Sequence, residues 1–274
     1  MNLNYQTREE LEEFAKNLRR DIVRMTNSSG VKGAHLGGSM SIVEIMAVLY
    51  GCVMDYDPKN PSMEERDRVI LSKAHAAMTL YSALSYAGFI DRAVIDTAMH
   101  GKSPLYEHPK KSAEMGIESS GGSLGMGLSF GMGMALGLKK KGNEKSRVFV
   151  IIGDGECDEG SIWEAATAII HYDLENVIPI IDRNSLQYDG TTEEVMNTGS
   201  MRARWESVGF EVVEVDGHDV MALKEVFEKK FEKPTVVIAN TIKGKGTSFA
   251  ENKVEWHSNQ VTDEMMEQAL AEIV

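Results

Sequence analysis

The chain has little cysteine, no long apolar run and fewer basic than acidic residues, and each shortage excludes a class of protein. Its two cysteines, Cys52 and Cys157, cannot form a disulfide framework or a thiolate metal site. No stretch approaches the roughly 20 apolar residues that a membrane-spanning helix needs. The opening MNLNYQTREELEEF lacks the charged-then-apolar pattern of a secretory signal, so a cytoplasmic location is expected.

The charge balance bears on possible ligands. The 29 Lys and Arg residues stand against 42 Asp and Glu residues, which gives a formal net charge of −13. Nucleic acid requires a basic face, so it is excluded as a partner. An anionic substrate would have to be captured by local groups, because the overall field repels it. The length of 274 residues and hydrophobic content of 42% suit one large domain over residues 1–274.

A strand–helix–strand pattern lies at the centre of the chain. Residues 148–152 form an unbroken apolar run, which predicts a strand buried on both faces of a parallel sheet. An apolar stripe over residues 162–170 predicts a helix, and the spacing of Ser161 and Glu164 predicts a capping box at its start. A second apolar run, residues 177–181, completes the crossover unit of α/β folds.

Polar residues follow both of these strands. Gly153-Asp154-Gly155 ends the first strand, and Asn184 follows the second. Because the carboxyl ends of parallel strands share one edge of a sheet, we expect Asp154 and Asn184 to lie together. A carboxylate, an amide oxygen and a loop carbonyl suit Mg²⁺, which a phosphate would also ligate. Asp and Asn are also common in ordinary turns, so the pair alone leaves both interpretations open.

Strands and helices alternate over the rest of the chain. A capping box at Thr7 and Glu10 predicts an amino-terminal helix, and Ser41 with Glu44 predicts the start of a buried apolar helix. Further strands are expected at residues 69–71, 211–215 and 236–239, and further helices after His75, over 223–231 and over 263–273. The pattern predicts an α/β fold with a mostly parallel central sheet flanked by helices on both faces.

Residues 117–137 combine glycine with apolar residues. Gly125 and Gly127 suggest a dinucleotide fingerprint, but the spacing to Gly131 is wrong and no strand precedes them. The segment instead predicts a loop that lets the backbone approach a ligand, followed by a closely packed helix.

These motifs together resemble the transketolase family. The segments GDGECDEGSIWEA and DRNSLQYDG resemble the diphosphate-binding motif of thiamine-diphosphate enzymes, and of transketolases in particular. The resemblance implies a thiamine-diphosphate-binding fold. It also implies that Asp154, Asn184 and the main-chain carbonyl of Leu186 hold Mg²⁺, for which Ca²⁺ or Mn²⁺ can substitute, and that Gly155 contacts the diphosphate.

Four of the seven histidines fall on segments that resemble family motifs: His35 in GAHLGGS, His75 in SKAHA, His108 in YEHP and His257 in EWHS. A loop histidine taken alone is more often solvated. The resemblance implies that His75 and His257 flank the cofactor, while His35 and His108 face substrate hydroxyls. Histidine titrates near neutral pH, which suits the proton transfers of ketol transfer. His100 matches no motif and is expected at the surface.

The resemblance also supplies further site residues and shows departures. Cofactor contacts are implied for Gly122, Ser123, Leu124 and Lys243, and Glu159 is implied among the catalytic residues. Glu164 either lies near the cofactor or caps its helix. The chain departs from the family pattern at Ala34, Ala74, Glu107 (where the family has Gly), Gly121, Met126 and Ser258.

The resemblance covers nearly the whole chain but only the diphosphate-binding half of a transketolase. It implies a subunit of a thiamine-diphosphate- and Mg²⁺-dependent transketolase that moves a two-carbon ketol unit from a ketose phosphate to an aldose phosphate. The glutamate that protonates the aminopyrimidine belongs to the family's other half. We therefore expect a separate pyrimidine-binding subunit in an α2β2 assembly. Ordinary pentose phosphates, sulfonated sugars and branched sugars all stay open as substrates.

Three alternatives share part of the pattern. A 2-oxoacid dehydrogenase or decarboxylase subunit shares Gly-Asp-Gly, but the motifs at His35, His75 and His257 count against it. Deoxyxylulose-phosphate synthase shares several loops but is normally one long chain. A non-catalytic cofactor-binding subunit would not need the metal pair or the histidines.

Overall fold

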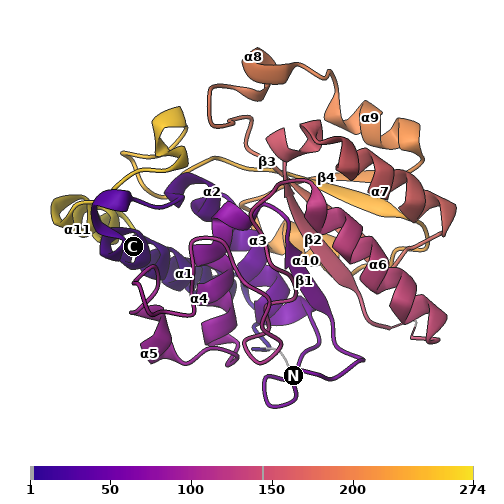
Figure 1. The fold of residues 1–274 in the computed structure, drawn as a ribbon, viewed down its shortest axis with the longest axis horizontal. Helices are drawn as coiled ribbons and strands as arrows, with labels where there is room; N and C mark the ends of the chain where they lie inside the picture. The colour runs from indigo at the N-terminus through magenta and orange to yellow at the C-terminus, as the bar shows by residue number, and fades with distance from the viewer. Residues whose placement is uncertain (1–2, 144, 274) are drawn as a thin grey trace.

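The computed structural model describes residues 3–143 and 145–273. Its centre is a five-stranded sheet in the order β1-β2-β3-β5-β4, and all pairings between these strands are parallel (Figure 1). The strands are β1 (Arg68–Leu71), β2 (Val148–Gly153), β3 (Val177–Arg183), β4 (Glu211–Asp216) and β5 (Thr235–Asn240). The predicted strands and the parallel sheet are therefore confirmed.

Helices cover both faces of this sheet, as predicted (Figure 1). One face carries α1 (Arg8–Ser28), α2 (Leu36–Met40), α3 (Val43–Val48), α4 (Ala77–Tyr86) and α10 (Val220–Glu228), with α11 (Asp263–Glu272) packed on α1. The other face carries α6 (Met126–Lys140), α7 (Gly160–His171) and α9 (Met201–Val208). Short helices α5 (Arg92–Ile95) and α8 (Thr192–Met196) lie in connecting segments.

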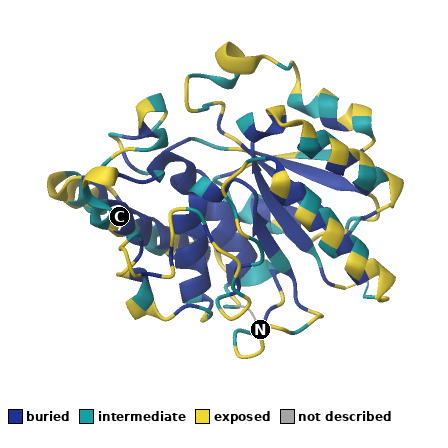
Figure 2. Ribbon diagram, viewed as in Figure 1, coloured by how far each residue is buried: buried dark blue, intermediate teal, exposed yellow. Residues whose placement is uncertain are grey.

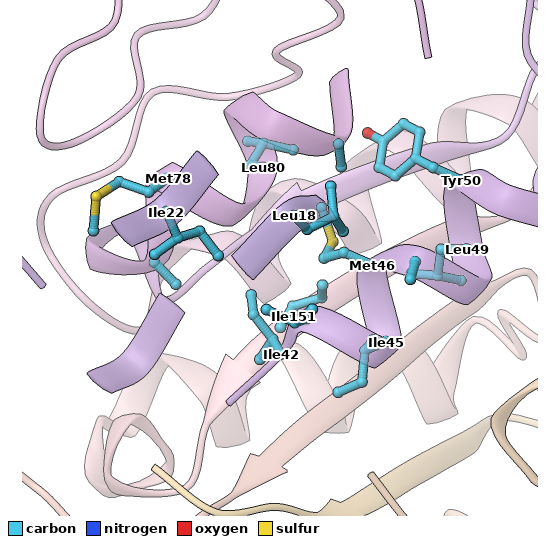
Figure 3. Close-up of a cluster of buried hydrophobic side chains, with 14 of the residues drawn as sticks. Leu18, Ile22, Ile42, Ile45, Met46, Leu49, Tyr50, Met78, Leu80 and Ile151 are labelled. Carbon is cyan, nitrogen blue, oxygen red and sulfur yellow. The ribbon is translucent and has the colours of Figure 1, made fainter. Parts of the chain in front are cut away.

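The sheet separates two hydrophobic cores. Successive side chains of β2 alternate between them, so Phe149 and Ile151 enter one core while Val150 and Ile152 enter the other. Strands β1, β2, β3 and β5 are consequently buried along most of their length, whereas the edge strand β4 is mostly exposed or half-buried (Figure 2). Figure 3 shows part of the first core, where Ile151 lies among side chains of α1 and α3. This two-sided burial explains why β2 and β3 read as nearly unbroken apolar runs.

Two predicted helix starts differ from the structure, and one is confirmed. At α1, Thr7 and Glu10 form the predicted capping box. The predicted box at Ser161 and Glu164 is wrong, because α7 begins at Gly160 with Glu159 as its N-cap and without a side-chain cap. The Ser161 hydroxyl instead donates to the carbonyl of Gly125 at 3.0 Å, so a tertiary contact has taken the capping side chain.

The predicted start at Ser41 also differs. Helix α3 begins at Val43, with Ile42 as its N-cap and no capping side chain. The Ser41 hydroxyl donates to the carboxylate of Asp182 at 2.7 Å, on the neighbouring strand β3. Glu44, the expected capping partner, is buried in an ion pair with Arg19. Both side chains therefore serve tertiary contacts.

The parallel arrangement brings the loops that follow β1, β2, β3 and β5 to one edge of the sheet, because these strands are neighbours. Residues far apart in the chain consequently meet there. Within residues 3–143 and 145–273, no helix combines the length and apolarity required to span a bilayer.

Helix α6 lies very close to the sheet, and glycine makes this possible. A β-carbon placed on Gly131 would lie 2.4 Å from Cγ2 of Val150 in β2. On the outer side of the same helix, a β-carbon on Gly133 would meet no atom within 4 Å. The two glycines therefore share a helix but have different surroundings.

This contrast predicts opposite effects of one substitution. Gly131→Ala should lower the free energy of unfolding of the isolated chain by about 1–3 kcal/mol, because the new methyl group overlaps a core side chain. Gly133→Ala should raise it by about 0.5–1 kcal/mol, because alanine has a higher helix propensity than glycine and the new methyl group meets no other atom. Urea denaturation measures both. Equal effects of the two substitutions would contradict the close contact of α6 with β2.

Candidate functional site

Asp154 and Asn184 line the same cavity at the carboxyl edge of the sheet. The cavity has a volume of about 180 Å³, and its walls include Gly153, Gly155, Leu124, Leu186, Lys243, His75 and His257. Asp154 and Asn184 are both buried. The Asp154 carboxylate accepts from the backbone N–H groups of Gly155 (2.9 Å) and Ser185 (2.5 Å). The two residues that sequence spacing pairs are thus brought together.

The amide of Asn184 has a defined orientation. Its Nδ2 donates to the carboxylate of Asp182 at 2.9 Å, and its Oδ1 accepts from the N–H of Leu186 at 3.1 Å. A carbonyl oxygen has two lone pairs, so Oδ1 keeps one for a further partner. Asp182 therefore determines which end of the amide is the oxygen.

These oxygens suit a hard cation that is also held by a ligand. No group of three or more His, Cys, Asp or Glu side chains that could bind a metal occurs in the part of the chain that the structure describes. A cation here would depend on Asp154, the Asn184 amide, a main-chain carbonyl and oxygens from a ligand. Burial, together with the nearby Asp182 carboxylate, raises the pKa of Asp154 to about 6. Such a destabilised carboxylate favours a cationic partner.

Lys243 places a buried ammonium group beside these oxygens. Its Nζ donates to the carbonyls of Leu186 (3.0 Å) and Gln187 (3.2 Å) and lies 2.9 Å from Nδ1 of His257. Burial and then the charge of Lys73 lower the pKa of Lys243 to about 8. A polyanionic ligand would relieve this repulsion, so the local field favours a diphosphate although the chain as a whole is acidic.

Four histidines from four separate segments form a cluster at the cavity, which His75 and His257 line. The ring centroid of His35 lies 5.5 Å from that of His75, 5.9 Å from that of His108 and 5.3 Å from that of His257. The rings of His75 and His257 are stacked at 5.2 Å. His100 is exposed and outside this group, as predicted.

The environment keeps the inner rings of the cluster uncharged. Burial, followed by the charge of Lys243, lowers the pKa of His257 to about 3. Burial, followed by the charge of Lys73, lowers the pKa of His75 well below its ordinary value. At neutral pH these rings are therefore neutral and can both donate and accept hydrogen bonds.

The remaining predicted site residues lie at or outside the rim of the cavity. Gly122 and Ser123 are exposed in the glycine loop, whereas Leu124 lines the cavity. Glu159 is exposed just before α7, and Glu164 is exposed on that helix. The structure of this chain alone does not bring Glu159 or Glu164 into the cavity.

Sequence reasoning missed a buried ion pair beneath the cavity. Lys73 Nζ contacts the Asp182 carboxylate, and both side chains are almost completely buried. Lys73 also donates to the carbonyl of Gly38 at 2.9 Å, and Thr241 donates to the same carboxylate. A signal was present, because Lys73 follows the apolar run of β1 and Asp182 follows that of β3, two strands that flank β2 in the sheet.

A second missed residue, Glu156, organises the glycine loop. Its buried carboxylate accepts from the Ser72 hydroxyl (2.5 Å) and from the N–H groups of Gly125 (2.8 Å) and Gly153 (3.0 Å). It therefore joins the ends of β1 and β2 to the start of α6. Nothing in the spacing of GDGECDEG separates this glutamate from its exposed neighbours.

A third missed group supports the loop that carries Lys243. Glu44 forms a buried ion pair with Arg19 and accepts from Nδ1 of His218 at 2.9 Å. The other ring nitrogen of His218 accepts from the N–H of Ile242 at 2.8 Å. Burial raises the pKa of Glu44, but the charge of Arg19 and the hydrogen bond from His218 outweigh it and lower the pKa to about 2. The position of Glu44 within an otherwise apolar helix could have indicated a buried charge with a partner.

Comparison with known proteins points to one family. A family model described as "Transketolase, thiamine diphosphate binding domain" matches residues 9–272. An apulose-4-phosphate transketolase subunit of Actinobacillus succinogenes is 41% identical over 274 residues, which cover 99% of this chain and 98% of that protein. The 6-deoxy-6-sulfo-D-fructose transketolase subunit SqwG of Clostridium sp. MSTE9 is 38% identical and covers 87% of this chain and 88% of its own.

Solved transketolases share the fold but are longer. The Campylobacter jejuni enzyme superposes with a TM-score of 0.85 at 27% identity, over 98% of this chain and 43% of that one. The chain likewise covers 42% of human transketolase, at 35% identity. The chain thus spans about two-fifths of the length of these enzymes, but 98% and 88% of the length of the two relatives named as subunits. The chain belongs to the transketolase family and corresponds to its thiamine-diphosphate-binding domain.

Proposed function

We propose that this chain is the diphosphate-binding subunit of a two-subunit transketolase that depends on thiamine diphosphate and Mg²⁺. It transfers a two-carbon ketol unit from a ketose phosphate to an aldose phosphate. The observation that carries this proposal is a cluster of four histidine rings, two of which, His75 and His257, line a cavity that also presents Asp154, Asn184 and Lys243.

The donor set fits the metal and the diphosphate. Asp154, Asn184 Oδ1 and the Leu186 carbonyl would hold Mg²⁺, and Ca²⁺ or Mn²⁺ could replace it because all three ligands are hard oxygens. Lys243 would balance diphosphate charge. The backbone of the glycine loop and of Gly155 would approach the cofactor closely, together with Gly122, Ser123, Leu124 and Glu164.

The protein's contribution is orientation and proton transfer. Thiamine diphosphate supplies the carbanion chemistry when it is bound. His75 and His257 are neutral and buried, so they would orient the cofactor and the reacting oxygens by hydrogen bonding. His35 and His108 would exchange protons with substrate hydroxyls, and each well-aimed donor lowers the barrier by a few kcal/mol. We place Glu159 with this group once a partner covers it.

A second subunit completes the site in this proposal. Two relatives that this chain covers to 98% and 88% of their own length are named as subunits. Tyr188, which lines the cavity, is 66% exposed, and α6 exposes 43% of Met126 and 45% of Phe130. Such apolar exposure beside a site suits burial by another chain. We propose an α2β2 assembly with a pyrimidine-binding partner.

The relatives' names suggest which donors to examine. One is named for apulose 4-phosphate and another for 6-deoxy-6-sulfo-D-fructose. Both are ketoses with an anionic end. A donor panel should therefore include these two sugars beside ordinary pentose phosphates.

The first test is reconstitution. The purified chain with thiamine diphosphate and Mg²⁺ should show no ketol transfer, because the group that protonates the aminopyrimidine is absent. Co-expression with a pyrimidine-binding subunit should give transfer to an aldose phosphate. Mass spectrometry of the products measures this transfer. Transfer by the chain alone would contradict the split enzyme. Turnover of pyruvate instead of ketoses would favour an oxoacid enzyme.

The second test concerns the metal ligand. Asp154→Asn removes one anionic ligand but keeps its size, so Mg²⁺-dependent binding of thiamine diphosphate to the complex should weaken by at least about 10–100-fold. Isothermal titration calorimetry measures this affinity. Asp189→Asn, at an exposed position of the next loop, is the matched control and should bind normally. Unchanged affinity in Asp154→Asn would exclude Asp154 as a metal ligand.

A further inference from the structure

Glu107 places a carboxylate against one of the four clustered histidines. Its Oε1 lies 3.0 Å from Nδ1 of His35. The two residues come from different segments, since His35 precedes α2 and Glu107 lies in the loop between α5 and α6. Glu107 is also the position where the segment departs from the family's Gly-His-Pro.

The surroundings of His35 leave Glu107 as the available partner for Nδ1. This nitrogen is buried, and no described residue forms a well-aligned hydrogen bond with it. The carboxylate lies within hydrogen-bonding distance but away from the ideal N–H direction. Because the Glu107 side chain is 48% exposed, a small rotation can align it. A donor at Nδ1 is therefore satisfied by this carboxylate, whereas an acceptor lone pair there would be repelled by it.

We propose that Glu107 is a positioning residue that holds His35 in the Nδ1–H tautomer and so makes Nε2 the proton acceptor of the histidine cluster. In the transfer reaction a substrate hydroxyl gives its proton to Nε2, and the resulting imidazolium is stabilised by the Glu107 carboxylate. The same proton later returns from Nε2 to the carbonyl oxygen of the acceptor sugar. The part of this inference that concerns a substrate rests on the proposed function. The tautomer and the proton affinity of His35 do not depend on that function.

The other three histidines lack this support. Nδ1 of His257 lies against the Lys243 ammonium, which opposes protonation of the ring. His75 is affected in the same direction by burial and by Lys73. No carboxylate contact is formed by His108 within the described ranges 3–143 and 145–273. Of the cluster, His35 is thus the ring whose protonated form has a counter-charge.

The sign of the effect follows from the groups that face His35. Burial lowers the pKa of His35, and the Glu107 carboxylate raises it, while His108 and Lys243 lower it. The neighbouring rings of His75 and His257 are themselves uncharged at neutral pH. Removing the Glu107 charge should therefore lower the pKa of His35 further and make Nε2 a weaker base.

The test is NMR of the full chain labelled with ¹⁵N-histidine, without cofactor or partner. His35→Gln identifies the His35 signals, and the ¹⁵N shifts report which ring nitrogen carries the proton. The Nδ1–H tautomer is expected. Glu107→Gln should lower the pKa of His35 by about one unit, the lower end for an opposite charge at this distance, because Glu107 is half exposed.

Two further variants separate charge from structure. Glu107→Asp keeps the charge, so the pKa of His35 should stay closer to its wild-type value than in Glu107→Gln. Glu114→Gln removes an exposed carboxylate from the same segment and should leave it unchanged. An Nε2–H tautomer in the wild-type chain, or the same His35 pKa in the wild type and Glu107→Gln, would overturn the inference.

Kinetics of the complex with its partner provide a second readout. Glu107→Gln should move the acidic limb of the pH profile of kcat/KM to lower pH by the same amount as the NMR shift. A complex without ketol transfer but with the NMR effect would refute the proposed function and leave the His35–Glu107 pair intact. An active complex whose pH profile is unchanged by Glu107→Gln would refute the role of Glu107 alone.

Discussion

The ion pair between Lys73 and Asp182 is the contact on which the geometry of the site depends. Two charges removed from water are stable only when they meet each other and further hydrogen-bonding groups. Asp182 meets this requirement by also binding Ser41, Thr241 and Asn184, which come from a helix junction, the loop after β5 and the loop after β3. Losing one partner of a buried pair typically costs about 3–5 kcal/mol. The segments that form the cavity are therefore held by one shared constraint.

This constraint also explains how an acidic chain can offer an anion site. The formal charge of −13 repels a diphosphate at long range. Inside the cavity, however, Asp182 neutralises Lys73, whereas Lys243 is held by carbonyl oxygens and a neutral histidine. The charge of Lys243 is thus not cancelled by a carboxylate in direct contact. Short-range electrostatics in a buried site outweigh the screened field of the surface.

The fold could be predicted from the sequence, but the site could be predicted only in part. Strands buried on both faces produce continuous apolar runs, so β2 and β3 were recognisable, and the parallel order placed Asp154 beside Asn184. The buried charges were less visible, since Glu156 and its exposed neighbours look alike in sequence. The capping pattern at Ser161 failed because a hydroxyl satisfies whichever neighbour the tertiary structure supplies. Resemblance located the histidines, but only coordinates reveal that Glu107 touches one of them.

The histidine cluster has a consequence for the order of events during protein synthesis. His35 and His257 are 222 positions apart (257 − 35), yet their rings lie 5.3 Å from each other. The segment Val254–His257 leaves the ribosome long after α1 and the first strands. A nascent chain can thus bury much of its core while the pocket still lacks a wall. The complete pocket forms only after this segment has been synthesised. Binding of a small molecule in the pocket therefore follows the folding of much of the core.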